Sequence, residues 1–310
     1  MENYDNYGDK KPNYFFRVSL IMLIVGVLLL IAGFAWHANA DMSKYYKTTE
    51  VNETYDAANV SGIEIDYSSC VVKLAKSNDD KIHITGKVPD DVKISCDEKL
   101  LIKQKMKIWS FFSLRFWDDD KQDTSLEILL PEKEYGNIYI DGGAGESELR
   151  DIQCDSVQID VGAGEIYFDN VKVKHTIDID GGAGEVDIAN VSCEKLMVDM
   201  GAGEMKVKDS ELSGKMTVDG GAGEIEVINT STGGLDIDCG VGEFTYSGRV
   251  EGDIKVDGGV GECTLDLENP SSDFGKGKKY SLDIDTGVGD VTVNYDQNPD
   301  SEGGRGGKSA

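Results

Sequence analysis

The sequence is poor in the residues from which most enzymes build their sites. It has three histidines among 310 residues, and His37, His83 and His175 form no recognisable constellation. None of its six cysteines forms a C-x-x-C pair, and neither a nucleophile elbow nor a zinc-binding helix motif is present. These absences disfavour zinc, thiol-redox and hydrolase chemistry, and we expect a protein that is not an enzyme.

Basic residues are also scarce. Lys and Arg number 31 against 58 Asp and Glu, which gives a formal net charge of −27. Residues 136–300 hold 35 acids and 12 bases, so −23 of that charge lies there. Nucleic-acid binding requires phosphate contacts from Lys and Arg, so the balance argues against a nucleic-acid partner.

Long apolar runs are absent except for one. "VSLIMLIVGVLLLIAGFAW", Val18–Trp36, carries no charge. As a helix it would span about 28 Å, close to the ~30 Å of a bilayer core. Lys10, Lys11 and Arg17 precede it, which places the N-terminus in the cytoplasm by the positive-inside rule.

This run predicts a single-pass protein of the cell membrane with an extracytoplasmic C-terminal part. Its segments are a cytoplasmic tail (1–17), a transmembrane helix (18–36) and a linker (37–57). The alternative is a signal peptide cleaved after Ala40, since "ANA" has the form of a cleavage site. The length of the apolar run favours a retained anchor.

Glycine, in contrast, is abundant, and much of it lies in one recurring motif. "DGGAGE" and its variants "DVGAGE", "DMGAGE", "DCGVGE", "DGGVGE" and "DTGVGD" occur eight times. The spacings between their first residues are 19, 20, 19, 20, 19, 19 and 28. A fixed period in this range is typical of a solenoid, propeller or array.

The residues around each motif alternate apolar and polar. "IDI" precedes and "VDI" follows one copy, and this two-residue period predicts half-buried β-strands. A propeller blade needs about 40 residues, so a 19–20-residue unit favours a β-solenoid with one rung per repeat. We therefore predict an all-β fold, a β-solenoid behind one N-terminal transmembrane helix, with regular repeats over 135–297 and a flexible tail over 298–310.

The motif itself predicts a corner. In "IDIDGGAGEVDI" the inward parity of Ile177 and Ile179 is opposite to that of Val186, so the phase slips after Ala183. The fifth residue, Gly184 here, supplies the backbone freedom for the turn. We expect the fourth residue, Ala or Val, to point inward. The second residue alternates small and large through Gly142, Val161, Gly181, Met200, Gly220, Cys239, Gly258 and Thr286, which predicts an inward position with complementary sizes on successive rungs.

The region before the repeats, 58–134, predicts irregular β rungs with an aromatic cap. "IWSFFSLRFW", Ile108–Trp117, either covers the end of the solenoid or forms an aromatic-basic hairpin that contacts lipid.

The cysteines divide into two groups. Cys154 and Cys193 take the place of apolar residues at equivalent repeat positions, so we expect them in the core. Cys70 and Cys96 could form a disulfide, which the sequence leaves open.

The motif carboxylates have several interpretations. A phosphate loop is excluded because a strand, not a helix, follows the glycines. The nonapeptide calcium repeat is excluded because Val186 stands where that motif requires Asp. Three remain: acceptors for corner amides, a solubility device, or two acidic ladders that bind Ca²⁺ or another divalent cation. The ladders would be Asp141, Asp160, Asp180, Asp199, Asp219, Asp238, Asp257 and Asp285, and Glu146, Glu165, Glu185, Glu204, Glu224, Glu243, Glu262 and Asp290. No other cofactor is expected.

These motifs carry a resemblance. "GIEIDYSSCVVKL", then "LEILLP", then the repeated motif between apolar-alternating strands resembles the bacterial putative-adhesin β-strand repeat family over residues 58–296. The resemblance implies a membrane-anchored, extracytoplasmic β-solenoid of unknown function and no known catalysis. The chain departs from it in the uniformity and acidity of its motifs.

Together these features predict a non-catalytic envelope interaction module with the membrane as one partner, through Val18–Trp36. A cell-wall glycan or a membrane protein is a possible second partner. The alternatives are an accessory of envelope-stress sensing and a cation-binding or glycan-active solenoid. The sequence does not fix the oligomeric state.

Overall fold

The computed structural model describes residues 47–104 and 124–296. The chain divides into two units, Met1–Lys47 and Thr48–Ala310, and the account below concerns the second. The predicted tail, transmembrane helix and cleavage site at its N-terminus, the aromatic stretch Ile108–Trp117 and the tail 298–310 lie outside the described residues. Among those that are described, no helix is long and apolar enough to cross a membrane.

The described part is all-β, as predicted. Its strands are β1 (Thr48–Asp56), β2 (Gly62–Lys76), β3 (Lys81–Pro89), β4 (Val92–Cys96), β5 (Lys99–Gln104), β6 (Ser125–Leu130), β7 (Glu134–Arg150), β8 (Gln153–Asp169), β9 (Lys172–Val173), β10 (Thr176–Ala189), β11 (Ser192–Cys193), β12 (Lys195–Lys208), β13 (Glu211–Ile228), β14 (Ser231–Gly248), β15 (Ile254–Leu267), β16 (Leu282–Val288) and β17 (Val291–Tyr295).

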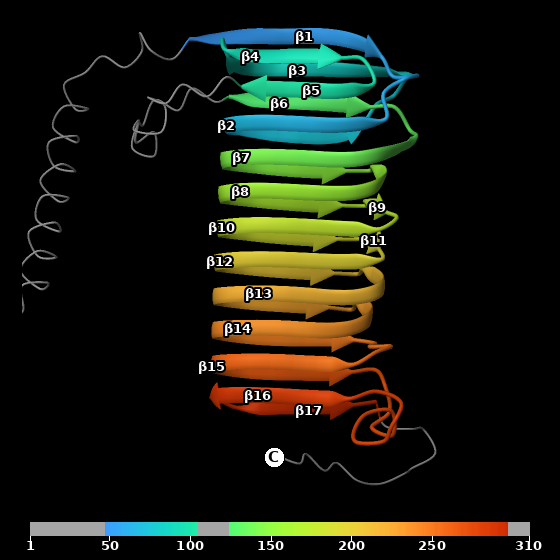
Figure 1. Cartoon of the computed structure of the whole chain (residues 1–310), viewed down its shortest axis with the longest axis vertical. Helices are drawn as coiled ribbons and strands as arrows, with labels where there is room; N and C mark the ends of the chain where they lie inside the picture. Colours follow the sequence, from blue (N-terminus) through green and yellow to red (C-terminus); the bar gives the residue numbers. More distant parts are fainter. Residues whose placement is uncertain (1–46, 105–123, 297–310) are drawn as a thin grey trace, which may run out of the picture. The chain divides into compact units, whose positions relative to one another are not determined.

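The long strands stack as the rungs of a parallel β-solenoid (Figure 1). β2, β7, β8, β10, β12, β13, β14 and β15 pair in that order, and β16 with β17 complete the last rung. Each long strand from β7 to β15 bends at its glycine motif, and β2 bends at the equivalent residues, so that one strand supplies two sides of its rung. The fold class predicted from the repeat is confirmed.

The ladder begins one rung earlier than the motif indicates. Asp66 of β2 pairs with Asp141 of β7, and Tyr67 pairs with Gly142. β2 therefore continues the regular stack inside the region predicted to be irregular. A second difference is β1, which lies within the predicted linker and pairs antiparallel with β3.

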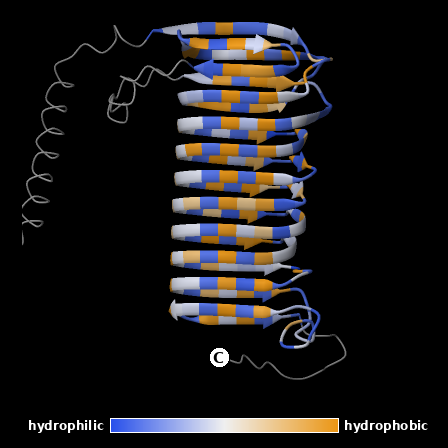
Figure 2. Cartoon of the chain, viewed as in Figure 1, coloured by the Kyte–Doolittle hydropathy of each residue, from blue (hydrophilic) through white to orange (hydrophobic). Residues whose placement is uncertain are grey.

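The hydrophobic core runs through the interior of the stack. Apolar and polar residues alternate along every long strand (Figure 2), and the apolar set is buried. Cys154 and Cys193 lie in this core with 2% and 6% of their surface exposed, as predicted. No disulfide joins the cysteines of the described residues, so Cys70 and Cys96 are not bridged.

The second motif position points inward, as predicted. Val161 and Met200 are buried, and each faces a glycine on the neighbouring rungs. The alternation extends to Tyr67, because a Cβ at Gly142 would lie 2.5 Å from the Tyr67 ring. The glycines therefore make room for the large side chains of adjacent rungs.

The fourth motif position points outward, and the prediction that it fills the core was wrong. Ala183, Ala202 and Ala222 are exposed, as are the valines that replace them further along. The paired register passes from Gly181 directly to Ala183 and omits Gly182, so the ladder is interrupted at the third position. The phase of the strand therefore slips one residue earlier than the parity argument placed it.

Candidate functional site: the acidic corner

The corner is built by the glycine at the fifth position of each motif. Gly184 has φ 147°, a conformation that L side chains rarely adopt. A Cβ at Gly184 would also fall well inside the contact distance of the carbonyl oxygen of Gly164 on the preceding rung. The same overlap recurs at each equivalent glycine from Gly145 to Gly289. Backbone conformation and close stacking together require glycine here, which confirms the predicted role.

The corner brings the sequence-predicted carboxylates into two columns. Asp141, Asp160 and Asp180 pair in register, and the column continues to Asp285 and begins at Asp66. The Glu column runs in the same way from Glu146 to Glu262, followed by Asp290 of the last rung. Successive members lie about 4.8 Å apart along the backbone ladder. The two columns predicted from the repeat are therefore present as continuous rows.

These carboxylates are not held by the corner backbone. No N–H of the described backbone donates a hydrogen bond to any of them, so the interpretation as acceptors for corner amides was wrong. Their few partners are side chains at the N-terminal end: Lys73 lies 3.5 Å from Glu146, and the Tyr167 hydroxyl donates to Glu165 at 2.7 Å. Most of the acidic surface therefore faces solvent without a protein partner.

The rows influence the protonation of their own members. The pKa of Asp160 is raised, first by partial burial and then by the negative charges of Asp180 and Asp141. The pKa of Asp199 is raised by partial burial and then by Asp219 and Asp180. Both shifts oppose ionisation, as expected for like charges on successive rungs.

The columns do not form a metal cage. Among the described residues, no group of three or more His, Cys, Asp or Glu side chains is close enough to hold a metal ion. A cation would instead meet carboxylates from successive rungs, one at a time or in pairs. Whether the ladders bind Ca²⁺ therefore stays a prediction.

A third column lies between the two acidic ones. Its residues were predicted to point inward, but they are on the surface. It is formed by the fourth motif position, and its members are alanine in the first five motif copies and valine in the last three. Val241, Val260 and Val288 are 56%, 50% and 67% exposed. The change from Ala to Val is present in the sequence. Because the fourth position was predicted to point inward, an exposed apolar row was not expected.

The opposite corner of the rung is built differently. Asp151, Asn170, Asn190, Asp209 and Asn229 occupy the left-handed region with φ between 47° and 56°. Their side chains join rungs, because Asn170 donates to Asp151 at 2.5 Å and Asn190 donates to Asp169 at 2.9 Å. An Asn or Asp recurring just after the second apolar strand of the first five repeats was the signal for this corner.

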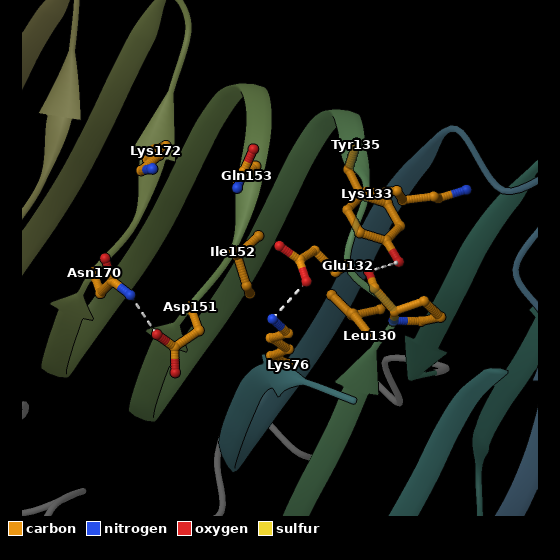
Figure 3. A pocket seen from close by; sticks show the side chains of 11 residues that line it. Lys76, Leu130, Glu132, Lys133, Tyr135, Asp151, Ile152, Gln153, Asn170 and Lys172 are labelled. Atoms are coloured by element: carbon orange, nitrogen blue, oxygen red, sulfur yellow. Dashed lines mark hydrogen bonds and ion pairs between the residues drawn. The ribbon is translucent and has the colours of Figure 1, made fainter. Parts of the chain in front are cut away.

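A polar notch lies beside this second corner (Figure 3). It encloses about 200 Å³ between Pro131, Tyr135, Ile152, Gln153 and Lys172. Two of its charged side chains already have partners in the protein. Lys76 pairs with Glu132 at 2.6 Å, and the Lys133 ammonium donates hydrogen bonds to the backbone carbonyls of Ala57 and Val60. The notch therefore offers little unpaired charge to a ligand.

The described histidines make surface pairs. His83 lies 2.9 Å from Asp79 and 3.2 Å from the Thr54 hydroxyl, and His175 lies 3.4 Å from Glu194.

An acidic parallel β-solenoid with glycine corners is the class of protein that the fold and the corner define. The family follows from comparison. The model of the Toastrack DUF4097 family matches residues 60–306, most of the chain, and the chain belongs to this family. No curated protein sequence matches this chain.

Solved structures give distant likenesses. A putative adhesin from Bacteroides fragilis is 15% identical with a TM-score of 0.44, and the match covers 80% of this chain and 97% of that one. A putative lipid binding protein from Parabacteroides distasonis is 13% identical with a TM-score of 0.47, covering 80% and 97%. A putative adhesin from Parabacteroides merdae is 15% identical with a TM-score of 0.43, covering 81% and 97%. The family assignment rests on the family model, not on these likenesses.

Proposed function

We propose that the chain is a non-catalytic, adhesin-like interaction module that its N-terminal apolar segment anchors in the cell membrane. The observation that carries this proposal is the acidic corner. Its carboxylates recur in register along the stack, yet the corner backbone bonds to none of them. Charges that repel one another and do not serve the fold suit a surface that meets partners outside the molecule.

The direction of display follows from charge in the sequence. Lys10, Lys11 and Arg17 precede Val18–Trp36, so the solenoid would lie outside the cytoplasm. Protease treatment of intact cells tests this, with epitope tags at either end of the full chain. We expect loss of the C-terminal tag and membrane retention of the N-terminal tag. A protected C-terminal tag would contradict extracytoplasmic display, and a soluble product lacking the N-terminal tag would contradict the anchor.

The partner is tested by crosslinking on intact cells, followed by purification from membranes. We expect the acidic corner to contribute to capture, so a chain with Asp199, Asp219 and Asp238 changed to Asn should recover less of the partner. Recovery of wall glycan or of another cell's surface component supports adhesion. Recovery of a sensor kinase would instead support the envelope-stress alternative.

Cation association is a second role that a specific observation favours. The pKa values of Asp160 and Asp199 are raised first by partial burial and then by the negative charges of neighbouring Asp residues, and a cation would relieve that repulsion. We expect millimolar Ca²⁺ to raise the melting temperature relative to EDTA, because a ligand that binds the folded state stabilises it. Identical melting curves in Ca²⁺ and EDTA would contradict this role.

A further inference from the structure

Exposed apolar surface is concentrated in one place on the described molecule. Four large hydrophobic side chains are exposed among the described residues, and three of them, Val241, Val260 and Val288, share one column. They pair in register across β14, β15 and β16. We call these three valines the apolar ridge. At the spacing of parallel strands it is about 10 Å long.

The ridge lies between two rows of negative charge. On each rung an Asp precedes the valine by three residues and an acid follows it by two. The flanking residues are Asp238, Asp257 and Asp285 on one side and Glu243, Glu262 and Asp290 on the other. Exposed apolar side chains that form one contiguous patch, unlike those scattered singly, mark a contact surface.

A dimple continues the ridge at its N-terminal end. It holds about 20 Å³ between Ala222 and Val241, and Met205, Val218 and Ile225 contribute to its lining. The dimple exists because Gly220 has no side chain between Met200 and Cys239 of the adjacent rungs. Its size suits the end of a single aliphatic side chain, the kind of anchor around which interfaces are organised.

We propose that the ridge and its dimple dock a basic amphipathic helix of a partner protein, lying along the stack. A helix rises about 5.4 Å per turn, which follows the ~4.8 Å step between rungs over this distance. A strand along the same line would present same-face side chains about 6.6 Å apart and lose register with the valines. Lys and Arg on both flanks of the helix's apolar stripe would meet the two rows of carboxylates.

A second copy of the chain fits this surface poorly. Placing ridge against ridge would bring the carboxylate rows of both copies together, and like charges across an interface oppose association. The proposal rests on the proposed function, since it names the partner chemistry for the acidic corner.

The test uses the full chain in phosphatidylcholine nanodiscs and two fluorescent 14-residue peptides. One peptide forms a helix with a leucine stripe flanked by lysines on both sides, and the other has the same composition scrambled. We expect the amphipathic peptide to bind more tightly than the scrambled one, and its affinity to fall as NaCl rises. Empty nanodiscs provide the blank for binding to lipid.

Variants assign the binding to the ridge. Changing Val241, Val260 and Val288 to Thr keeps β-branched side chains but removes apolar surface, and should weaken binding about tenfold. Met197→Thr, which changes the exposed hydrophobic residue outside the ridge, should leave affinity unchanged. Glu243→Gln with Glu262→Gln should weaken binding and reduce its salt dependence, whereas Glu211→Gln away from the corner should do neither. Melting curves confirm that each variant is folded.

Several results would overturn the proposal. Equal binding of the scrambled peptide would show that charge alone attracts it, and unchanged affinity in the valine variant would remove the ridge. A dimer that the same variant dissolves would assign the ridge to self-association. These outcomes leave the membrane-display test untouched, so the two proposals can fail separately.

Discussion

In five successive rungs, from β7 to β13, the two corners use similar residues in opposite ways. At the asparagine corner, Asn170 and Asn190 adopt a left-handed backbone and donate hydrogen bonds to carboxylates of the adjacent rung. At the glycine corner, the turn is made by residues without side chains, and the neighbouring carboxylates bond to no backbone amide. One corner uses its acids to join rungs, and the other leaves them available to solvent.

The largest expected effect is at the glycine corner. Gly184→Ala should prevent folding or cost at least about 3 kcal/mol, because the methyl group collides with the Gly164 carbonyl and φ is unfavourable. Thermal melts of the purified chain measure it. Gly181→Ala is the matched control, since its Cβ would lie 3.7 Å from the nearest atom, Met200 Cγ. Equal melting temperatures for the two variants would show that the corner does not constrain its backbone.

A smaller effect is expected at the asparagine corner. Asn190→Ala should destabilise the chain by about 1–3 kcal/mol, through an unfavourable left-handed residue and a lost hydrogen bond to Asp169. Asn190→Gly keeps the backbone conformation and loses only the hydrogen bond, so urea denaturation of both variants separates the two contributions. If glycine and alanine were equally destabilising, the left-handed conformation would not be the cause.

The smallest effect concerns the acidic columns. Because the pKa of Asp199 is raised in the folded state, the folded chain holds this proton more tightly than the unfolded one, and its contribution to stability falls as pH rises through the raised value. Asp199→Asn should therefore raise the melting temperature slightly at pH 7. The gain should shrink towards pH 4 and in 1 M NaCl, where the charge is neutralised or screened. A lower melting temperature at pH 7 would mean that the carboxylate has a stabilising partner.

Much of the fold could be predicted because its determinants are local and repeated. The alternation of apolar and polar residues predicted the strands, and the 19–20-residue period predicted the rungs. The glycine at the fifth motif position predicted the corner. The first rung was missed because β2 turns its corner with "DYSSC", in which Tyr67 takes the second position and Cys70 stands where every later rung has glycine. Only the paired register reveals that equivalence.

The site was predicted in its residues but not in its arrangement. The carboxylate columns follow directly from the stacking of identical motifs. The direction of the fourth position did not, because it depends on one unpaired residue, Gly182 in the third position, whose effect on phase is not encoded by hydropathy. As a result, an exposed row of alanine and valine was assigned to the core.

The alternation at the second motif position limits how this molecule can change its length. Tyr67, Val161, Met200, Cys239 and Thr286 each lie against glycine on neighbouring rungs. Gain or loss of a single repeat would set two large side chains, or two glycines, against each other, leaving either a clash or a void in the interior. Duplication by pairs of rungs, about 39 residues at a time, would preserve the packing. We therefore expect this solenoid to lengthen or shorten by two rungs at a time rather than by one.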